Sequence, residues 1–254
     1  MYLKFCAGGT MRLDVFLHEN SLVSSRTKAK EIIRAGRVSV DGITIEKPAF
    51  EVNTLTSKIE VKPSENQEYV GRGGIKLEYA LDTFSIQPSG KICVDIGAST
   101  GGFTDCLLKR GAAVVYAIDS GTNQLSRSLR NNPRVISLEN TNARYIDRTV
   151  IGGNFADLVV MDVSFISQKL LYPSISTISR SGTDIVTLIK PQFEAGKEHL
   201  DKHGVVKSES VRKKVIEDII SCSASFGFEY KGLTESPIKG GTGNTEYLIY
   251  LKKL

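Results

Sequence analysis

Residues 94–104 read Val-Asp-Ile-Gly-Ala-Ser-Thr-Gly-Gly-Phe-Thr, and the rest of the chain can be interpreted outward from them. The apolar run that ends at Ile96 predicts a strand, the small residues after it predict a tight turn, and Phe103 opens a helical pattern. A strand, a turn and a helix N-terminus in this order bring the backbone close to a small ligand. A second apolar run, 113–118, ends at Asp119, a carboxylate suited to the hydroxyls of a ribose. The stretch therefore predicts half of a nucleoside-binding α/β domain.

Strand and helix patterns alternate from residue 92 to residue 220. This alternation predicts a doubly wound, mostly parallel sheet with helices on both faces. Further strands are expected at residues 134–139, 156–161, 184–189, 226–230 and 246–251, the last two as a pair at one edge. Ligands of such sheets lie beyond the carboxyl ends of the strands. At or near these ends the sequence places Asp95, Asp119, Asn142, Asp162 and Lys190.

The loop 97–102 is neither G-x-G-x-x-G nor a phosphate-binding loop with Gly-Lys-Ser/Thr. Asp95, just before the loop, suits a ligand with an ammonium group. S-adenosylmethionine combines that group with a ribose for Asp119 and an adenine near Asn142, whereas NAD or no ligand stays open as an alternative. The residues expected to bind S-adenosylmethionine are Asp95, Gly97, Ser99, Gly101, Gly102, Phe103, Asp119 and Asn142.

The N-terminal segment has a different pattern. Leu13, Phe16 and Leu17 have helical spacing, Ser24-Ser25 can cap a second helix over 26–35, and Asp41-Gly42 is a two-residue hairpin signal. Basic residues crowd this second helix, where cations can follow a phosphate backbone, although a solvated basic surface is the alternative. The candidate RNA-binding residues are Arg12, Arg26, Lys28, Lys30, Arg34, Arg37 and, farther on, Arg72.

The order Arg-Leu-Asp-x-x-Leu, then Ser-Arg, then Ile-x-x-Gly-x-Val-x-Val-Asp-Gly resembles the S4 RNA-binding domain. This resemblance covers residues 11–62 and implies a small α+β module that binds RNA. Residues 63–70 are polar, contain Pro and lack periodicity, which is typical of a linker. The second domain is then expected at 71–254.

Four polar residues at predicted element ends face the expected ligand side: Lys76, Asp162, Lys190 and Glu246. This set resembles the Lys-Asp-Lys-Glu tetrad of FtsJ-like RNA ribose 2′-O-methyltransferases. The motifs Gly-Arg-Gly-Gly-x-Lys, Val-Met-Asp-Val-Ser-Phe-Ile and Ile-Lys-Pro-Gln-Phe-Glu, behind an S4 module, resemble more closely the haemolysin A-like (TlyA) family. The resemblance implies a Rossmann-like methyltransferase domain with a mostly parallel seven-stranded sheet, acting on cytidine ribose in ribosomal RNA or ribosomal subunits.

The tetrad suits this chemistry because a ribose 2′-hydroxyl is a poor nucleophile, so the enzyme must remove a proton and align the acceptor. Lys190 could take the proton if desolvation and the nearby cation Lys76 favour its neutral form. Alternatively, nearby carboxylates could keep it charged, so that it stabilises the developing alkoxide. Asp162 would orient the amine, and Glu246 would position Lys76 or the ribose.

Other functions stay open. N-methyltransferases commonly carry Asn/Asp-Pro-Pro-Tyr/Phe after the fourth strand, whereas this chain has Asp162-Val163-Ser164-Phe165, which favours an oxygen acceptor. A non-catalytic ribosome-assembly factor that binds RNA and a membrane-active haemolysin are the remaining alternatives. The net charge of +5 fits an anionic partner in either RNA-binding case.

The composition narrows the setting. The four cysteines form no C-x-x-C pair, and the three histidines show no ligand spacing, so reduced thiols and no metal site are expected. No apolar stretch approaches the roughly 20 residues of a membrane span, and residues 1–10 lack the pattern of a signal peptide. The sequence therefore predicts a cytoplasmic protein without a membrane partner, and residues 1–10 are set aside as an upstream start or a remnant.

Overall fold

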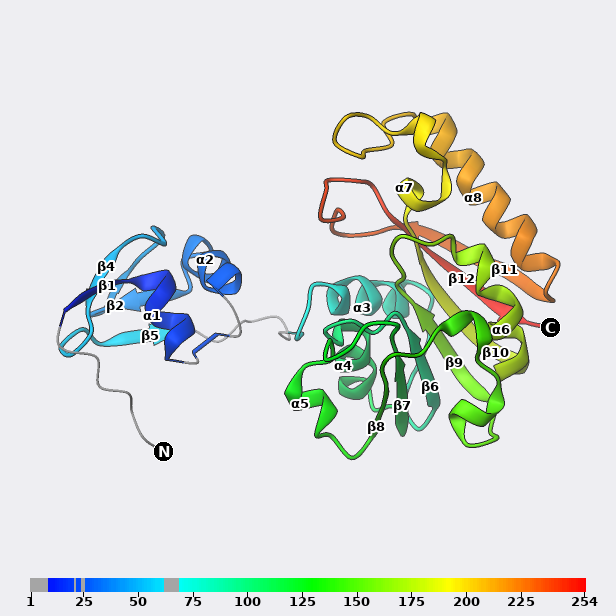
Figure 1. Cartoon of the computed structure of the whole chain (residues 1–254), viewed down its shortest axis with the longest axis horizontal. Helices are drawn as coiled ribbons and strands as arrows, with labels where there is room; N and C mark the ends of the chain where they lie inside the picture. Colours follow the sequence, from blue (N-terminus) through cyan, green and yellow to red (C-terminus); the bar gives the residue numbers. More distant parts are fainter. Residues whose placement is uncertain (1–8, 21, 24–25, 62–68) are drawn as a thin grey trace. The chain divides into compact units, whose positions relative to one another are not determined.

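The computed structural model describes residues 9–20, 22–23, 26–61 and 69–254. It divides into two compact units, Met1–Glu68 and Tyr69–Leu254, which Figure 1 shows as the blue-to-cyan and the teal-to-red parts of the chain. The predicted cap at Ser24-Ser25 and most of the predicted linker, 63–70, lie outside the described residues.

The N-terminal unit combines two short helices with small antiparallel strands. Its core contains Leu13, Leu17 and Ile33 from the helices and Val38 and Val52 from the strands. The hairpin predicted at Asp41-Gly42 is confirmed: both residues have positive φ, and Ser39 and Val40 pair with the strand that follows. The elements are β1 (Thr10–Arg12), α1 (Leu13–Glu19), α2 (Arg26–Arg34), β2 (Val38–Val40), β3 (Ile43–Thr44), β4 (Glu51–Asn53) and β5 (Ile59–Val61).

Three of these strands were not predicted from the sequence. Strand β1 pairs with β4, and β5 pairs with β2, so the hairpin is part of a three-stranded sheet. Each of the three strands has only three residues, too few for a recognisable alternation. Thr10 belongs to β1, so the first strand begins one residue before residue 11, where the S4-like domain was expected to start.

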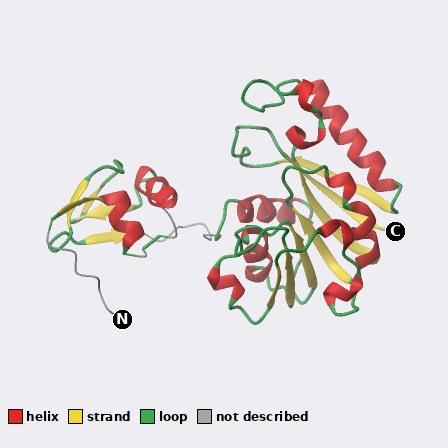
Figure 2. Ribbon diagram, in the orientation of Figure 1, coloured by secondary structure: helices red, strands yellow, loops and turns green. Residues whose placement is uncertain are grey.

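The C-terminal unit is built on a seven-stranded sheet in the order β11-β12-β10-β9-β6-β7-β8. Five strands are parallel, and β12 runs antiparallel to both of its neighbours, which confirms the mostly parallel α/β fold (Figure 2). The strands are β6 (Ile92–Ile96), β7 (Val114–Ile118), β8 (Val135–Leu138), β9 (Ala156–Met161), β10 (Ser179–Ile189), β11 (Phe228–Glu235) and β12 (Tyr247–Lys253).

Helices cover both faces of this sheet, and the side chains of the strands alternate between two apolar clusters. Cys93 of β6 packs with helices α3 and α4, whereas its neighbour Val94 packs with α6 and α8 on the other face. Strands that are apolar on both faces are typical of buried parallel sheets. The helices are α3 (Gly73–Thr83), α4 (Gly102–Lys109), α5 (Arg127–Arg130), α6 (Tyr172–Ile178), α7 (Pro191–Glu194) and α8 (Glu209–Ala224).

The last two strands pair as predicted, but β12 is not at the edge. It lies between β11 and β10 and pairs with β10 from Asp184↔Lys252 to Ile189↔Tyr247. Because the two strands are antiparallel, the residue after β10 and the residue before β12 meet at the same end of the sheet. Those residues are Lys190 and Glu246.

Candidate active site

Three neighbouring strands bring three of the four tetrad residues to one edge of the sheet. Asp162 directly follows β9, Lys190 directly follows β10, and Glu246 directly precedes β12. Met161 pairs with Thr187, and Ile189 pairs with Tyr247, so these strand ends lie side by side. The fourth residue, Lys76, lies in the first turn of α3, whose Gly73 would place a Cβ atom 3.8 Å from Oδ2 of Asp162.

Lys190 and Asp162 form one of two lysine–carboxylate pairs. Nζ of Lys190 lies 2.6 Å from Oδ1 of Asp162, and it donates a hydrogen bond to Oγ of Ser164 at 2.8 Å. The same amine lies 6.0 Å from the ring centre of Phe193, in α7. The lysine side chain is only 12% exposed, so the protein replaces most of its water with these partners.

Lys76 and Glu246 form the second pair, which is more deeply buried. Nζ of Lys76 lies 2.5 Å from Oε2 of Glu246, and the two side chains are 10% and 3% exposed. A Cβ atom at Gly240 would lie 2.4 Å from Oε1 of Glu246, so a larger residue there would have to displace this carboxylate. Loss of one partner would leave a buried charge unpaired, which is strongly unfavourable.

The two glycine-containing segments of the sequence lie against each other. A Cβ atom at Gly102 would lie 3.0 Å from the backbone nitrogen of Gly74 and 3.1 Å from the carbonyl oxygen of Gly71. A Cβ atom at Gly97, where φ is 81°, would lie 2.6 Å from the carbonyl oxygen of Asp162. These close approaches place the first turns of α3 and α4 beside the loop that follows β9.

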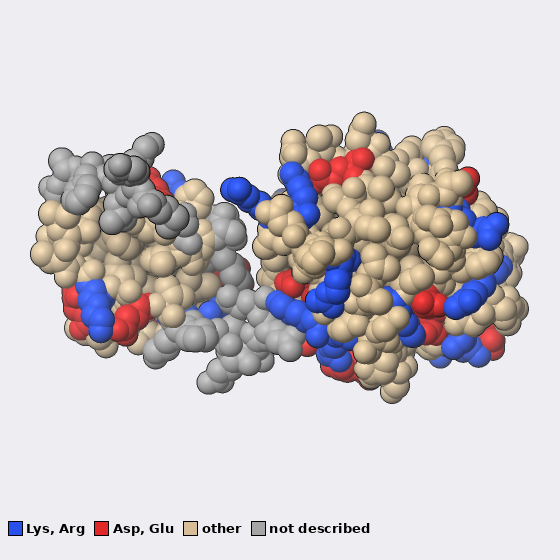
Figure 3. All heavy atoms as spheres, turned by 90° about the horizontal axis from the view of Figure 1, so that it is seen from below, with Lys and Arg blue, Asp and Glu red and all other residues tan. Residues whose placement is uncertain are grey.

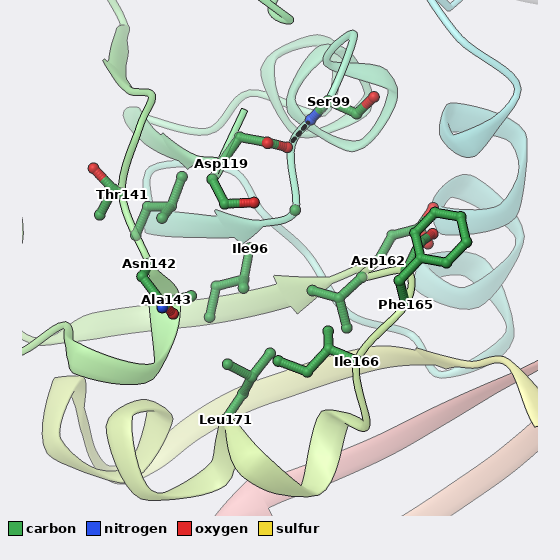
Figure 4. Close-up of a pocket in the computed structure, with 15 residues that line it drawn as sticks. Ile96, Ser99, Asp119, Thr141, Asn142, Ala143, Asp162, Phe165, Ile166 and Leu171 are labelled. Atoms are coloured by element: carbon green, nitrogen blue, oxygen red, sulfur yellow. Dashed lines mark hydrogen bonds between the residues drawn. The ribbon is translucent and has the colours of Figure 1, made fainter. Parts of the chain in front are cut away.

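Two cavities open at this edge, with volumes of about 380 and 190 Å³. The larger one contains Asp119 and Asn142 among apolar side chains that include Ile118, Ile166 and Leu171 (Figure 4). The smaller one contains Gly71, Arg72, Gly73, Gly102, Phe103 and Lys190. Both cavities are lined by Gly97, Ser99, Asp162 and Ser164.

Asp119 and Asn142 hold the loops that line the larger cavity. The two carboxylate oxygens of Asp119 accept hydrogen bonds from the backbone nitrogens of Ser99 and Gly121, each at 2.7 Å; Figure 4 shows the first of these. The side chain of Asn142 accepts from the backbone nitrogen of Arg144. A carboxylate has about four lone-pair sites, so Asp119 can still accept from a ligand.

Two residues expected to bind the cofactor line neither cavity. Asp95 is fully buried and accepts a hydrogen bond from Oγ1 of Thr104 at 2.6 Å, so its predicted direct contact with an ammonium group is not supported. Burial raises the pKa of Asp95 to about 7. Gly101 has a φ of 99°, and a Cβ atom there would lie 2.2 Å from Leu129. Gly101 therefore allows the turn of the backbone and does not contact a ligand in either cavity.

Phe165 and Ser164 were quoted within a motif but not singled out from the sequence. Phe165 has a φ of 62°, is 91% exposed and lines the larger cavity. Its ring centre lies 5.0 Å from that of Phe193. A bulky residue with positive φ is uncommon, but a single sequence carries no signal for it, so only its place three residues after Asp162 could have marked it.

Two of the candidate RNA-binding residues share one buried carboxylate. Asp14 is fully buried and accepts from Nε of Arg12 at 3.0 Å and from Arg26 at 3.4 Å. The hydrogen bond from Arg12 holds the pKa of Asp14 below its usual value. Arg34 is exposed, whereas Lys30 and Arg37 are half-buried. The side chain of Lys28 lies outside the described residues.

Charges on the C-terminal unit are mixed on the face that Figure 3 presents, where Lys and Arg side chains alternate with Asp and Glu. Within the described residues, no group of three or more His, Cys, Asp or Glu side chains could hold a metal ion. In the same part of the chain, no helix is long and apolar enough to cross a membrane.

The sheet order defines a Rossmann-like α/β domain, with two cavities and two lysine–carboxylate pairs at the carboxyl edge of its sheet. Residues 69–253 match the FtsJ-like methyltransferase family, and residues 11–54 match the S4 domain. The chain belongs to the FtsJ-like methyltransferases that carry an S4 domain, the group that includes haemolysin A and TlyA, which confirms the resemblance found in the sequence.

Relatives resemble the chain over nearly its whole length. Hemolysin A of Brachyspira hyodysenteriae is 45% identical over 240 residues, which are 94% of this chain and 99% of that protein. The 16S/23S rRNA (cytidine-2′-O)-methyltransferase TlyA of Mycobacterium tuberculosis is 44% identical over 241 residues, 95% of this chain and 89% of that protein. A solved structure of a candidate hemolysin from Streptococcus thermophilus is 40% identical, with a TM-score of 0.75, and covers 97% of this chain and 90% of that one.

Proposed function

We propose that the protein is an S-adenosylmethionine-dependent methyltransferase that modifies the ribose 2′-hydroxyl of cytidine in ribosomal RNA. One observation carries this proposal: the pair of Lys190 and Asp162 lies where the two cavities meet. A methyl donor in one cavity and a ribose in the other would therefore meet beside an amine and a carboxylate. The name of the TlyA relative supports the choice of cytidine in ribosomal RNA.

The larger cavity fits S-adenosylmethionine. Asp119 can accept hydrogen bonds from ribose hydroxyls, and apolar Ile118, Ile166 and Leu171 suit the faces of an adenine near Asn142. Gly97 and Ser99 bring the backbone to the junction of the two cavities without large side chains. When bound, this cofactor supplies a methyl group on a sulfonium, which is already a strong electrophile.

The protein's own residues then have to prepare the acceptor. Lys190, held by Asp162 and Ser164, lines the smaller cavity and stabilises the charge that develops on the 2′-oxygen, either by taking its proton or by a hydrogen bond. General acid–base help of this kind contributes about 10² to 10⁴ in rate, so alignment of the acceptor must supply much of the remainder.

Lys76 and Glu246 support this arrangement without lining either cavity. Their buried ion pair joins the first turn of α3 to the residue before β12. Arg72 lines the smaller cavity and suits an RNA phosphate beside the target ribose. The basic residues of the S4 domain would hold the RNA and contribute affinity without reading bases. An enzyme with this substrate would act in the cytoplasm.

The test is transfer of tritium from labelled S-adenosylmethionine to ribosomal RNA of a strain that lacks this protein, followed by mapping of 2′-O-methyl sites. Transfer should fall at least about 100-fold in Lys190→Ala and in Asp162→Ala. The first change removes the amine that acts on the 2′-oxygen, and the second removes the carboxylate that holds this amine.

Lys213→Ala is the matched control, since this exposed lysine pairs with Glu209 on α8 and lines neither cavity. Full transfer by both site variants would show that the tetrad assignment is wrong. Binding of RNA without any transfer or cofactor binding would favour an assembly factor. Membrane lysis by purified protein that is unchanged in Lys190→Ala would favour a haemolysin.

A further inference from the structure

Ser164 has a contact that the tetrad does not explain. It lies two residues after Asp162, is exposed, and lines both cavities. Its Oγ accepts a hydrogen bond from Nζ of Lys190 at 2.8 Å. An exposed serine contributes little to core packing, so this contact with the amine is its main interaction.

The contact fixes the direction of the amine. An ammonium group has three donors arranged as a tetrahedron. Among the described residues, Nζ of Lys190 has two polar partners, Oδ1 of Asp162 at 2.6 Å and Oγ of Ser164 at 2.8 Å. The hydrogen bond to Ser164 fixes the rotation of the group about its Cε–Nζ bond, and the ion pair with Asp162 occupies a second side of the amine. The remaining position, a hydrogen in the charged amine or a lone pair in the neutral one, then has a single direction.

A second contact holds the same two segments together. Phe165 follows Ser164, Phe193 lies three residues after Lys190, and their ring centres are 5.0 Å apart. The left-handed φ of Phe165 turns the chain directly after Ser164. The segments that carry the serine hydroxyl and the lysine amine are therefore held together by a ring contact as well as by the hydrogen bond.

We propose that Ser164 is a positioning residue that aims the Lys190 amine at the ribose 2′-oxygen. The inference rests on the proposed methyltransferase function and adds a fifth residue to the tetrad. Ser164 forms no bond to the substrate in this role; it acts through Lys190.

Substitution should affect turnover more than binding. Ser164→Ala removes one hydrogen bond to a charged group, and we expect kcat to fall about 10- to 100-fold. KM for S-adenosylmethionine and for RNA should stay within about threefold, because both cavities keep their shape. Ser164→Thr retains the hydroxyl and should recover most of the rate. Ser167→Ala is the control, since that serine donates to Glu194 and does not contact Lys190.

A double-mutant cycle tests whether Ser164 acts through the lysine. In the Lys190→Met background, measured in single turnovers with excess enzyme, Ser164→Ala should change the residual rate less than about twofold. An equal loss in both backgrounds would overturn the proposal, as would a Ser164→Ala enzyme with kcat within about threefold of the wild type.

A measurement without turnover separates this inference from the proposed function. Protons of a hydrogen-bonded, mostly buried ammonium exchange slowly, so ¹⁵N-lysine NMR at low temperature should show an Nζ signal that disappears in Lys190→Met. That signal should broaden or vanish in Ser164→Ala and persist in Ser167→Ala and Ser164→Thr. Persistence in Ser164→Ala would overturn the positioning role. Loss of the signal in an enzyme that transfers no methyl group to RNA would overturn only the proposed function.

Discussion

Asp14 and Asp95 are both fully buried, yet their surroundings affect the two carboxyl groups in opposite directions. Two arginines donate to Asp14, and the hydrogen bond from Arg12 lowers its pKa. Hydrogen bonds from Thr104 do not offset the burial of Asp95, and its pKa is raised to about 7. In the sequence, each of these aspartates stands between apolar residues. The charge of each carboxyl group depends on its burial and on its hydrogen-bond partners, which only the structure shows.

The raised pKa of Asp95 predicts a stability that depends on pH. Its pKa in the folded protein exceeds that of an unfolded aspartate, so unfolding releases a proton and the wild type loses stability as pH rises from about 4 to about 7. Asn does not titrate. We expect the Tm of Asp95→Asn relative to wild type to increase across this range, as measured by calorimetry at several pH values.

Asp82→Asn provides the comparison for this measurement. The hydrogen bond from Arg110 lowers the pKa of Asp82, so its contribution is lost only as pH falls through the acid range. Its Tm relative to wild type should stay constant between about pH 5 and pH 8. A Tm difference for Asp95→Asn that is flat over the same range would show that this buried carboxyl group is charged throughout.

At the scale of elements, the active site follows from the ends of three strands. The positions of Asp162 and Lys190 at strand ends could be predicted, because apolar runs mark the strands and polar residues mark where they stop. The insertion of β12 between β10 and β11 could not be predicted, because the sequence of a short apolar strand does not show which strands lie beside it. That insertion is what brings Glu246 beside Lys190 and within reach of Lys76.

Substitution of Gly97 should have a measurable effect on cofactor binding. The φ of Gly97 is 81°, and a Cβ atom there would lie 2.6 Å from the carbonyl oxygen of Asp162, which leaves no room for a side chain. We expect Gly97→Ala to weaken S-adenosylmethionine binding at least about tenfold in titration calorimetry, because the loop must move away from both cavities. It should also cost about 1–3 kcal/mol in stability.

Gly90→Ala separates backbone strain from the collision. Gly90 has a similar φ of 73°, but nothing lies within 4 Å of its Cβ position. This variant should lose about 1 kcal/mol of stability and keep its cofactor affinity. Equal cofactor affinity in both variants would mean that the close approach of Gly97 to Asp162 does not shape the cofactor site.

At the scale of the whole molecule, each unit has its own core, and the sequence predicted both kinds of fold. Long apolar strands and the Asp41-Gly42 turn carry local signals, which is why they could be found. The hydrogen bond of Ser164 and the burial of Asp95 depend on residues from other elements of the fold. Local sequence patterns therefore do not predict them. The strands and the turn were therefore open to prediction from local patterns, whereas these contacts were not.

Separate cores predict separable functions. A chain of residues 69–254 should bind S-adenosylmethionine within about threefold of the full chain, since both cavities are lined from within this unit. Its affinity for ribosomal RNA should fall about 10- to 1,000-fold, with a weaker dependence on salt because phosphate contacts are lost. Filter binding over a salt series would measure the RNA affinity and its dependence on salt. Unchanged RNA affinity would place RNA recognition in residues 69–254.

The ion pair of Lys76 and Glu246 joins residues that are 170 positions apart in the chain. Contacts of such long range form late, because the loop between them must close before they contribute any stability. The last strand in the sequence must also enter between two strands that precede it. Partly folded chains with a finished β6-α4 segment would therefore hold a donor loop but lack the completed tetrad. Methyl transfer would then begin only when folding is complete, which makes activity a direct readout of the native topology.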